Sequence, residues 1–399
     1  MENKSVGLIS LGGYLPAKEL KEDQVEKLVK YLRKHTNLHE WYINEIESTG
    51  KLPGDIETNY DGWESKPWYD AWVKSLPEKK QANPFQGTTE RRRVPMDPGS
   101  VKESVVPHPM LPSDAETIAG ALAIVNAGID PDEIDLVLSH SQVPDRPLPT
   151  NASLIQEKLG LKNAGAYSVD TCCSTFVTMM EVATAMVKTG IKKKVLIVSS
   201  ILDSIINDKS TYWSVDTGDA SLAGIITSVE EGEGYLSSFS NSHGDRHDGV
   251  VFAERSPMLF KKPELGSDCK QHFVTFLNQE SLKRIAKNAQ SDLKHAVDQT
   301  LEKIDYNIDN IDFFVTHQPV SWAGNAWREA IDIPEEKFFE TFEKYANIAT
   351  CSAGVNLLEA IENNKIKAGD NLLIASSGAG ENHIALVMKV PAQLIANCN

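Results

Sequence analysis

Two adjacent cysteines, Cys172 and Cys173, are the residues of this sequence best suited to nucleophilic chemistry. They lie in the polar turn of AYSVDTCCSTFVTMMEVATAM, residues 166–186, between a short β-prone run and an apolar segment with helical periodicity. The pattern predicts thiols at the N-terminus of a buried helix, where unpaired N–H groups and the helix dipole favour a thiolate. The dipole contributes at most about 2 kcal/mol, so the thiol is only marginally ionised at neutral pH. A nucleophile here therefore needs a nearby histidine.

Short apolar strands alternate with helices along the chain, and this alternation indicates a layered α/β fold. Strands are expected at residues 5–13, 134–139, 166–169 and 194–200. Helices are expected at residues 23–34, 151–160 and after residue 174. Ser113 to Glu116 have the sequence of a capping box, which predicts a helix that runs to Ala127 and is closed by Gly128.

An internal repeat relates two parts of the chain. Residues 129–142 resemble residues 306–318, with His140 matching His317 at an offset of 177, which is 317 minus 140. Residues 196–200 resemble residues 373–377 at the same offset, whereas Thr171-Cys172 matches Thr350-Cys351 with a displacement of two. Two copies of one α/β unit bring their equivalent loops together. We therefore expect Cys173, His317 and the loop before Cys351 to lie in one neighbourhood.

Length, composition and charge exclude several classes of protein. The chain has 399 residues, 41% of them hydrophobic, which suffices for one large domain or two similar halves. Its net charge of −16 argues against a nucleic-acid partner, because phosphate binding needs a basic surface. The sequence has no long apolar run, no leader pattern and only five cysteines. These features predict no membrane association and a reducing, cytoplasmic location.

Three segments have uncertain roles from sequence alone. The two densest basic clusters in the sequence are Arg91, Arg92 and Arg93, and Lys192–Lys194. Each is interpreted either as a binding site for a phosphate-bearing ligand or as a run of solvated charges. Residues 35–87 hold four tryptophans and are interpreted as a surface insertion with its own small core, or as a lid or subunit contact. The histidine-rich segment 243–248 is interpreted as a polar surface loop, with no metal expected.

Four motifs, the first of which contains the cysteine pair, carry a resemblance to a known family. They are AYSVDTCCSTF around Cys173, FFVTHQP around His317, KYANIATCSAGVNLLEA around Asn347, and the glycine-rich NLLIASSGAGENHIALVMKV near the C-terminus. In this order and spacing, the chain resembles the thiolase-fold condensing enzymes, specifically the beta-ketoacyl-acyl-carrier-protein synthase III-like group. The resemblance covers roughly residues 5–30 and 88–392. It implies a homodimer with a five-layered α-β-α-β-α arrangement of two duplicated βαβαβαββ halves, residues 1–210 (with an insertion at about 35–87) and 211–399.

The resemblance also assigns catalytic roles. Cys173 is implied as the nucleophile that carries an acyl group as a thioester. The backbone N–H groups of Cys173 and Gly378 are implied as the oxyanion hole. His317 and Asn347 are implied as donors to the thioester carbonyl of a second substrate. Cys172 matches a small residue in the family and is interpreted as packing beside the active turn.

The implied reaction is acyl transfer from an acyl-CoA or acyl-carrier-protein thioester to Cys173, followed by condensation with a malonyl- or β-ketoacyl-type thioester. No cofactor is implied beyond coenzyme A or phosphopantetheine as the substrate carrier, and no metal. Substrate contacts are expected from Leu148, which lies where a partner subunit usually plugs the acyl pocket in this family. They are also expected from Ser376, which replaces a bulky aromatic residue of the family, and from Arg91, Arg92 and Arg93. The extra segment 35–87 favours secondary metabolism, fatty-acid-like or polyketide. Transfer from Cys173 to an amine or hydroxyl, or a non-catalytic partner subunit, are the alternatives.

Overall fold

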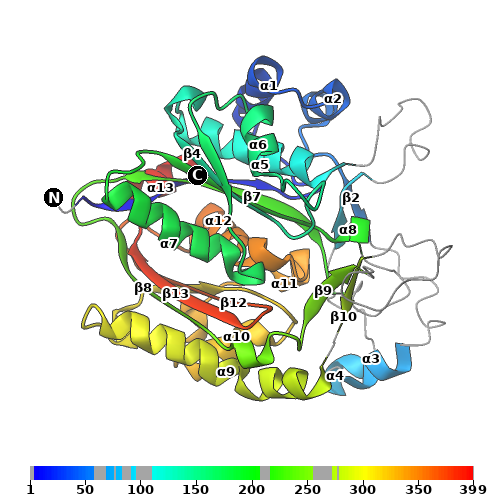
Figure 1. The fold of residues 1–399 in the computed structure, drawn as a ribbon, viewed down its shortest axis with the longest axis vertical. Helices are drawn as coiled ribbons and strands as arrows, with labels where there is room; N and C mark the ends of the chain where they lie inside the picture. The colour runs from blue at the N-terminus through cyan, green and yellow to red at the C-terminus, as the bar shows by residue number, and fades with distance from the viewer. Residues whose placement is uncertain are drawn as a thin grey trace.

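The structure is a computed structural model that describes residues 4–57, 69–75, 78–82, 91–95, 110–206, 216–254, 272–275 and 278–398. Its helices and sheets alternate in five layers, as the family resemblance implied (Figure 1). Helices α1, α5 and α6 cover the first sheet, α7 and α12 lie between the two sheets, and α9 and α10 cover the second (Figure 1). None of the described helices combines the length and the apolar character that crossing a bilayer requires.

The first sheet is built from the N-terminal part of the chain. Its strand order is β1-β7-β6-β4-β5, with β4 parallel to β5 and β6, and β7 antiparallel to β6 and β1. The elements of this part are β1 (Val6–Tyr14), α1 (Glu22–His35), α2 (Glu40–Thr49), β2 (Asp55–Glu57), α3 (Tyr69–Ser75), α4 (Glu78–Gln81), β3 (Arg91–Arg93), α5 (Pro112–Ala127), β4 (Leu136–Ser141), α6 (Ala152–Lys158), β5 (Gly165–Ser168), α7 (Thr175–Lys188), β6 (Val195–Leu202), α8 (Asp203–Ile206) and β7 (Asp219–Ser228).

The second sheet is built from the C-terminal part. Its order, β11-β12-β13-β8, repeats the order β4-β6-β7-β1 of the first sheet with the same strand directions. The elements are β8 (Gly234–Ser242), β9 (Val251–Glu254), β10 (His272–Thr275), α9 (Gln279–Glu302), β11 (Phe313–Thr316), α10 (Ala323–Ala330), α11 (Phe342–Tyr345), α12 (Ser352–Glu362), β12 (Asn371–Gly378), β13 (Asn382–Lys389) and α13 (Ala392–Cys398).

The two halves differ from the predicted duplication in two respects. The predicted boundary at residues 210–211 is wrong, because β7 belongs to the first sheet, so the halves meet in the loop 229–233 between β7 and β8. Among its described residues, the second half also lacks a counterpart of β5. The segment at that position forms the short helix α11, and the pairing that the described residues give β11 on that side is a single bridge between Phe314 and Phe338.

The central helices carry the core between the sheets. α7 is apolar around most of its circumference, and Phe176, Met179 and Met180 are buried against both sheets. Burying each such side chain contributes about 1.5–3 kcal/mol. The flanking strand β6 is buried along its whole length, as its continuous apolar run Val195–Val198 predicts for a parallel strand covered on both faces. The beginning of α7 is therefore held rigidly.

The repeat is more regular in space than in sequence. A 3-10 turn at Cys172–Ser174 precedes α7, and a 3-10 turn at Ala349–Cys351 precedes α12, so the offset is again 177, which is 349 minus 172. Cys172 and Ala349 both have positive φ, 54° and 43°. The predicted displacement of two, which matched Cys172 to Cys351, is therefore wrong. It followed the shared Thr-Cys letters, whereas the backbone equivalent of Cys173 is Thr350.

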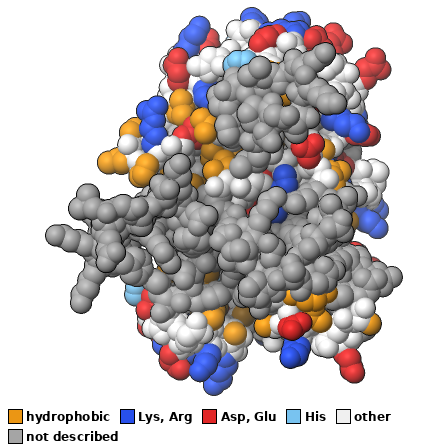
Figure 2. Space-filling model, turned by 90° about the vertical axis from the view of Figure 1, so that its right-hand side faces the viewer, with side chains coloured by type: hydrophobic (Ala, Val, Ile, Leu, Met, Phe, Trp, Pro, Cys, Tyr) orange, Lys and Arg blue, Asp and Glu red, His pale blue; other side chains and the backbone are white. Residues whose placement is uncertain are grey.

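The segment 35–57 of the predicted insertion packs on the first half. Tyr42, Ile43 and Ile46 of α2 are buried in the same core as α1 and α5. Trp41 contacts the Tyr42 ring edge-on at 5.2 Å. Trp63, Trp68 and the side chain of Trp72 lie outside the described residues. Figure 2 shows that basic and acidic side chains are interspersed on the described surface of the face it presents.

The predicted capping box before α5 is not formed. Pro112 begins the helix, and the Asp114 carboxylate accepts a hydrogen bond from the backbone N–H of Leu111. Glu116 instead turns into the core, where it accepts hydrogen bonds from Ser141, Ser200 and Asn151. Local sequence suggested a cap because the spacing was right, but the buried hydroxyl and amide donors hold the carboxyl more strongly.

Glu116 makes stability depend on pH near neutrality. It is fully buried, and burial raises its pKa from 4.5 to about 7. The folded protein thus keeps a proton that the unfolded chain releases, so this contribution is complete below pH 4.5 and is lost as pH rises through 7. We expect the free energy of unfolding to fall by about 1 kcal/mol between pH 6 and pH 8 through this group. Urea titrations at both values measure it, and Glu116→Gln, which cannot ionise, should remove that part of the dependence. Equal pH dependence in the two proteins would contradict the assignment.

Candidate active site

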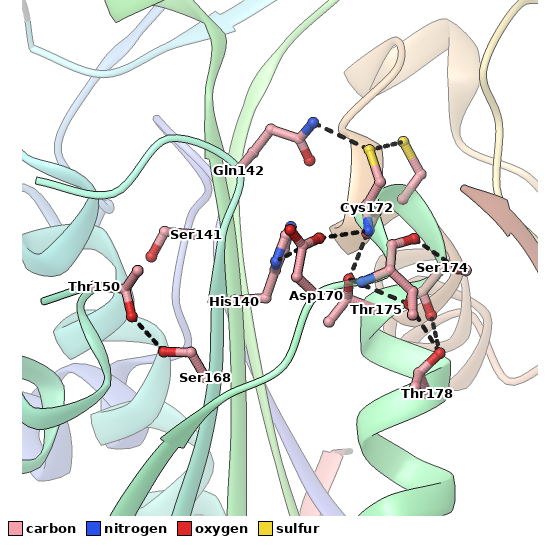
Figure 3. A network of polar contacts seen from close by, with 12 residues as sticks. His140, Ser141, Gln142, Thr150, Ser168, Asp170, Cys172, Ser174, Thr175 and Thr178 are labelled. Atoms are coloured by element: carbon pink, nitrogen blue, oxygen red, sulfur yellow. Dashed lines mark hydrogen bonds and ion pairs between the residues drawn. The ribbon is translucent and has the colours of Figure 1, made fainter. Parts of the chain in front are cut away.

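The cysteine turn lies where β5 ends and α7 begins, as the sequence predicted (Figure 3). The Asp170 carboxylate accepts a hydrogen bond from the backbone N–H of Cys172 at 2.8 Å, and the Thr175 hydroxyl donates to the carbonyl of Cys172 at 2.7 Å. These local bonds hold Cys172 at its positive φ, a conformation that costs a non-glycine residue of the order of 1–3 kcal/mol. A strained backbone over-determined by its neighbours is typical of a functional turn.

The two thiols of the turn contact each other. Their Sγ atoms are 3.8 Å apart, and Nε2 of Gln142 donates to the Cys172 sulfur at 3.4 Å (Figure 3). The S–H of Cys173 and the Gln142 amide together lower the pKa of Cys172 to about 7. The same contact, with burial, raises the pKa of Cys173.

The end of strand β12, from the second half, packs directly against the cysteine turn. Gly378 approaches it so closely that a Cβ at this position would lie 2.1 Å from the carbonyl oxygen of Thr171. Only glycine fits there. The neighbouring backbone of Ala379 hydrogen-bonds the Cys173 thiol. The backbone that surrounds the cysteine on this side therefore comes from the end of β12 and the residue after it.

Ser376 does not have the position that its predicted substrate contact requires. Its side chain is fully buried and its hydroxyl donates to the backbone carbonyl of Cys173 at 3.1 Å. The prediction was wrong because it assumed that the residue in place of a bulky aromatic keeps facing the substrate. A small hydroxyl can instead turn to the nearest buried carbonyl, which would otherwise lack a donor.

His317 directly follows β11 and is almost completely buried. Burial lowers its pKa to about 3, and the ring interacts with the backbone of Ala349. The imidazole is therefore neutral at neutral pH and presents one N–H. Among the described residues its Nδ1 has no hydrogen-bond partner. Its duplicate, His140, is likewise buried, but Nδ1 of that ring lies 3.6 Å from the Asp170 carboxylate.

Asn347 is held by the loop that leads into α12. Its side-chain oxygen accepts the backbone N–H of Ala349 at 2.8 Å, and its backbone pairs with Asp216 and Gly218. Because the oxygen is engaged, the amide nitrogen is the group left to donate into the site. Ala349 thus links His317 and Asn347, since it contacts both side chains through its backbone.

One cavity of about 110 Å³ brings these groups together. Cys173 and Asn347 face it from opposite halves, and the backbone contacts at Ala349 connect it to His317. The residues around it are Gln142, Cys172, Cys173, Ile201, Asp203, Thr217, Val250, Val251, Asn347, Ala349 and Ala379. The predicted neighbourhood of Cys173, His317 and the loop before Cys351 is therefore present. A thiol, two neutral donors and backbone N–H groups in a buried cavity suit thioester chemistry.

Arg92 and Arg93 are turned into the protein, against the prediction that they bind substrate. Arg92 is buried, donates to the carbonyl of Pro16 at 2.9 Å and lies over the Tyr345 ring. Arg93 pairs with Asp203 at 3.4 Å. The side chain of Arg91 lies outside the described residues. The charge run was misread because its strand, β3, is anchored in the first half, where its cations satisfy buried acceptors.

Leu148 lies away from the cavity of its own chain. Its side chain is 87% exposed. Its predicted contact with substrate stays a prediction. Sequence reasoning missed Gln142, Asp203 and Thr217 around the cavity. Gln142 carried a signal, because it closes the repeated segment that contains His140. Thr217 begins TGDASLAGIIT, residues 217–227, a weaker match to the same family.

Comparison with known families gives two matches in the same chain. The family described as 3-oxoacyl-[acyl-carrier-protein] synthase III matches residues 167–244, and the C-terminal region of the same synthase matches residues 301–390. The two matches include the cysteine turn, His317 and Asn347. They exclude the segment 35–87.

Curated proteins and solved structures agree with these matches. The chain is 34% identical over 284 residues to the beta-ketoacyl-[acyl-carrier-protein] synthase III of Aliarcobacter butzleri, covering 67% of this chain and 80% of that protein. It is 26% identical over 344 residues to the protein of that name from Fusobacterium nucleatum, covering 85% and 95%. The priming beta-ketosynthase of the R1128 polyketide pathway superposes with a TM-score of 0.70 at 18% identity, covering 98% and 97%. The synthase III of Aquifex aeolicus gives 0.65 at 22%, covering 96% and 99%.

Proposed function

Because the chain belongs to the beta-ketoacyl-[acyl-carrier-protein] synthase III family, we propose that it is an acyltransferase that forms a carbon–carbon bond between two thioesters. The first substrate is an acyl-CoA or acyl-carrier-protein thioester, and the second is a malonyl- or β-ketoacyl-type thioester. The observation that carries the proposal is the shared cavity, which joins Cys173 of one half to Asn347 and, through Ala349, to His317 of the other.

Loading places the acyl group on Cys173. The thiolate attacks the thioester carbonyl, the carbonyl electrons move to oxygen, and collapse of this oxyanion expels the carrier thiolate, which takes up a proton. The backbone N–H groups of Cys173 and Gly378 are the proposed oxyanion hole, and the contact of Ala379 with the thiol adds a third donor beside them. Substrate also fills the cavity and removes water, which strengthens these bonds.

Condensation uses the two side-chain donors. When the malonyl thioester loses CO₂, the electron pair of the broken C–C bond moves into the thioester and gives an enolate. Asn347, with its oxygen already engaged by Ala349, donates its amide N–H to this enolate oxygen. Neutral His317 is the second proposed donor, and its single ring N–H exchanges its contact with the backbone of Ala349 for the enolate oxygen. The enolate carbon then attacks the acyl-Cys173 carbonyl, the C–S bond breaks, and the thiolate is restored.

Intact-mass measurement tests this sequence of steps. The purified protein, incubated with acyl-CoAs of increasing chain length, should gain the mass of one acyl group. Addition of a malonyl thioester should then remove that mass and yield a β-ketoacyl product with one CO₂ released. An adduct that is discharged only by amines or alcohols would support the heteroatom-transfer alternative instead. The chain length that loads best also tests the secondary-metabolism assignment, which fails if acetyl and malonyl-carrier protein react best.

We also propose that the protein is a homodimer. β5 ends the first sheet, and among the described strands nothing pairs with its outer edge. Tyr167 on this strand is 50% exposed, and Leu148, on the loop that leads to α6, is 87% exposed. Pairing of the two β5 edges would join the five-stranded sheets, satisfy the open backbone groups and bring Leu148 to the partner.

Sedimentation measures this prediction. The wild-type protein should sediment at twice the mass of the chain, and Tyr167→Asp should shift it toward the monomer, because a charge at the paired edge must be desolvated. Ile191→Asp is the matched control, since Ile191 is also exposed, 69%, but belongs to the loop after α7 and not to β5. A monomeric wild-type protein, or equal effects of both substitutions, would contradict the proposed edge.

A further inference from the structure

Two unusual sequence segments meet outside the active cavity. His243 follows β8 in the histidine-rich loop, His383 lies on β13 just after the cysteine-supporting strand, and Asp292 projects from α9. One potential ligand atom of each lies within 4.8 Å of the others. Nε2 of His243 is 3.5 Å from one Asp292 oxygen, and Nε2 of His383 is 3.9 Å from the other. We refer to these three residues as the His2Asp cluster.

His383 is the central observation, because its buried ring nitrogen lacks a partner. The side chain is 3% exposed, and its Nε2 makes no hydrogen bond within the described part of the chain. Nδ1 of the same ring is engaged with the Ser377 hydroxyl at 2.8 Å, which fixes the ring so that Nε2 points at the carboxylates. An outer hydrogen bond on one nitrogen with the other nitrogen left open is the usual environment of a metal-bound imidazole.

The charges around the cluster are compatible with a cation. Glu381 brings a second carboxylate, whose oxygen lies 3.6 Å from Nε2 of His383. The buried Arg246 pairs with Asp292 at 2.8 Å and lies 3.8 Å from Glu381. Two carboxylates and one guanidinium sum to a net charge of −1 when both imidazoles are neutral. Buried, unneutralised charge is costly, so the cluster needs either a metal ion or a proton.

We propose that the His2Asp cluster binds a divalent transition metal, best matched by Zn²⁺. Imidazole nitrogen and carboxylate oxygen are zinc ligands at about 2.0–2.2 Å, and in a tetrahedral site such ligands lie about 3.3 Å from one another. The histidine-to-carboxylate separations are 3.5–3.9 Å, and the ligand atoms of the cluster lie within 4.8 Å of one another, so side-chain movements of up to about 1.5 Å would bring them to this value. Nε2 of His243 would exchange its contact with the Asn241 amide, 3.2 Å away, for the metal. Glu381 or water completes the coordination.

The metal would connect two segments of the chain that border the active cavity. The loop that begins at His243 continues to Val250 and Val251, which line the cavity, and the strand that holds His383 is paired with the strand that ends at Gly378. His243 already bonds the carbonyl of Glu381 through its backbone N–H at 2.9 Å. A metal ion between the two segments would fix one wall of the cavity, so the site is structural and takes no part in the chemistry.

Zinc content and thermal melting of the full-length protein test the site. Protein stripped with EDTA and re-equilibrated with ZnCl₂ should retain about one zinc per chain by elemental analysis after gel filtration. Its melting temperature should rise relative to the EDTA-treated protein. His383→Ala and His243→Ala should each weaken zinc binding at least tenfold and remove most of that rise.

His247→Ala is the matched control, because His247 is exposed in the same loop and bonds only the carbonyl of Gly244 among the described residues. It should retain zinc like the wild type. Should the buried variant His383→Ala fail to fold, His243→Ala decides, since His243 is partly exposed. Wild-type protein that retains no zinc, or equal zinc retention by all three variants, would overturn the proposal and leave a proton shared within the cluster.

Discussion

Cys173→Ala protein should gain no mass from any acyl-CoA, and its condensation rate should fall more than about a thousandfold. Alanine has no atom that can form the acyl thioester, so both steps lose their covalent intermediate. Intact-mass spectrometry measures the first effect, and release of the carrier thiol with β-ketoacyl product measures the second. An acyl adduct that survives the substitution would place the nucleophile elsewhere.

Cys172→Ala is the matched control, because it removes the adjacent thiol and leaves Cys173 in place. Its acyl adduct should persist. The largest cause that raises the pKa of Cys173 is its contact with Cys172, so the substitution should also lower the pKa of Cys173. The pH midpoint of iodoacetamide labelling at Cys173 should then fall below that of the wild type. Loss of the adduct in Cys172→Ala, with the adduct retained in Cys173→Ala, would exchange the roles of the two cysteines.

His317→Ala and Asn347→Ala should separate the two steps. Both variants should still load the acyl group, because the proposed oxyanion hole is made of backbone N–H groups that neither substitution removes. Condensation should fall by about 10²–10³ in each, the usual cost of removing one fixed donor to a developing oxyanion. Single-turnover discharge of preloaded protein with a malonyl thioester measures this step without interference from loading.

His140→Gln supplies the control for His317, since His140 is the duplicate at the same place in the other half and does not line the cavity. This variant should still condense, with a loss much smaller than that of His317→Ala, because His140 reaches the cysteine turn only through Asp170. Unchanged discharge in both His317→Ala and Asn347→Ala would argue against enolate stabilisation. It would favour transfer of the acyl group to an amine or hydroxyl, which needs a base and no enolate donors.

The fold could be predicted because its signals are local and repeated. The apolar runs at 134–139 and 194–200 became β4 and β6, and the glycine at 128 closed α5 where it was expected. The offset of 177 predicted the duplicated order of the elements. It did not reveal that α11 replaces a strand, because the segment Phe342–Tyr345 has the composition of either element.

The direction of buried polar side chains could not be predicted. Ser376, Arg92 and Glu116 each bond a group more than 75 residues away in sequence, at Cys173, Pro16 and Ser200. Residue type states what a side chain can donate or accept, and the tertiary contacts decide which partner it meets. The predicted roles of the first two failed for this reason, and so did the predicted cap at the third.

The backbone's part in the site was equally hidden. Ala349 and Ala379 have side chains with no chemistry, yet their backbone groups hold His317, Asn347 and the Cys173 thiol. A motif search compares residue types. The residue type alanine does not indicate whether the backbone has a positive φ or whether its N–H points into a cavity. The three proposed catalytic side chains could be recognised in the sequence, because their residue types and the surrounding motifs identify them.

The meeting point of the halves, residues 229–233, has a consequence for engineering. A chain interrupted there would keep the proposed nucleophile, Cys173, on one fragment and the two proposed side-chain donors on the other. α13 of the second fragment would still have to dock on β1 of the first, where the Asn397 amide donates to the carbonyl of Ile9. Enzymatic activity would then be restored only when the two polypeptides reassemble. The loop is thus a natural place to divide the enzyme into two fragments for a complementation assay, in which the measured signal is the condensation reaction.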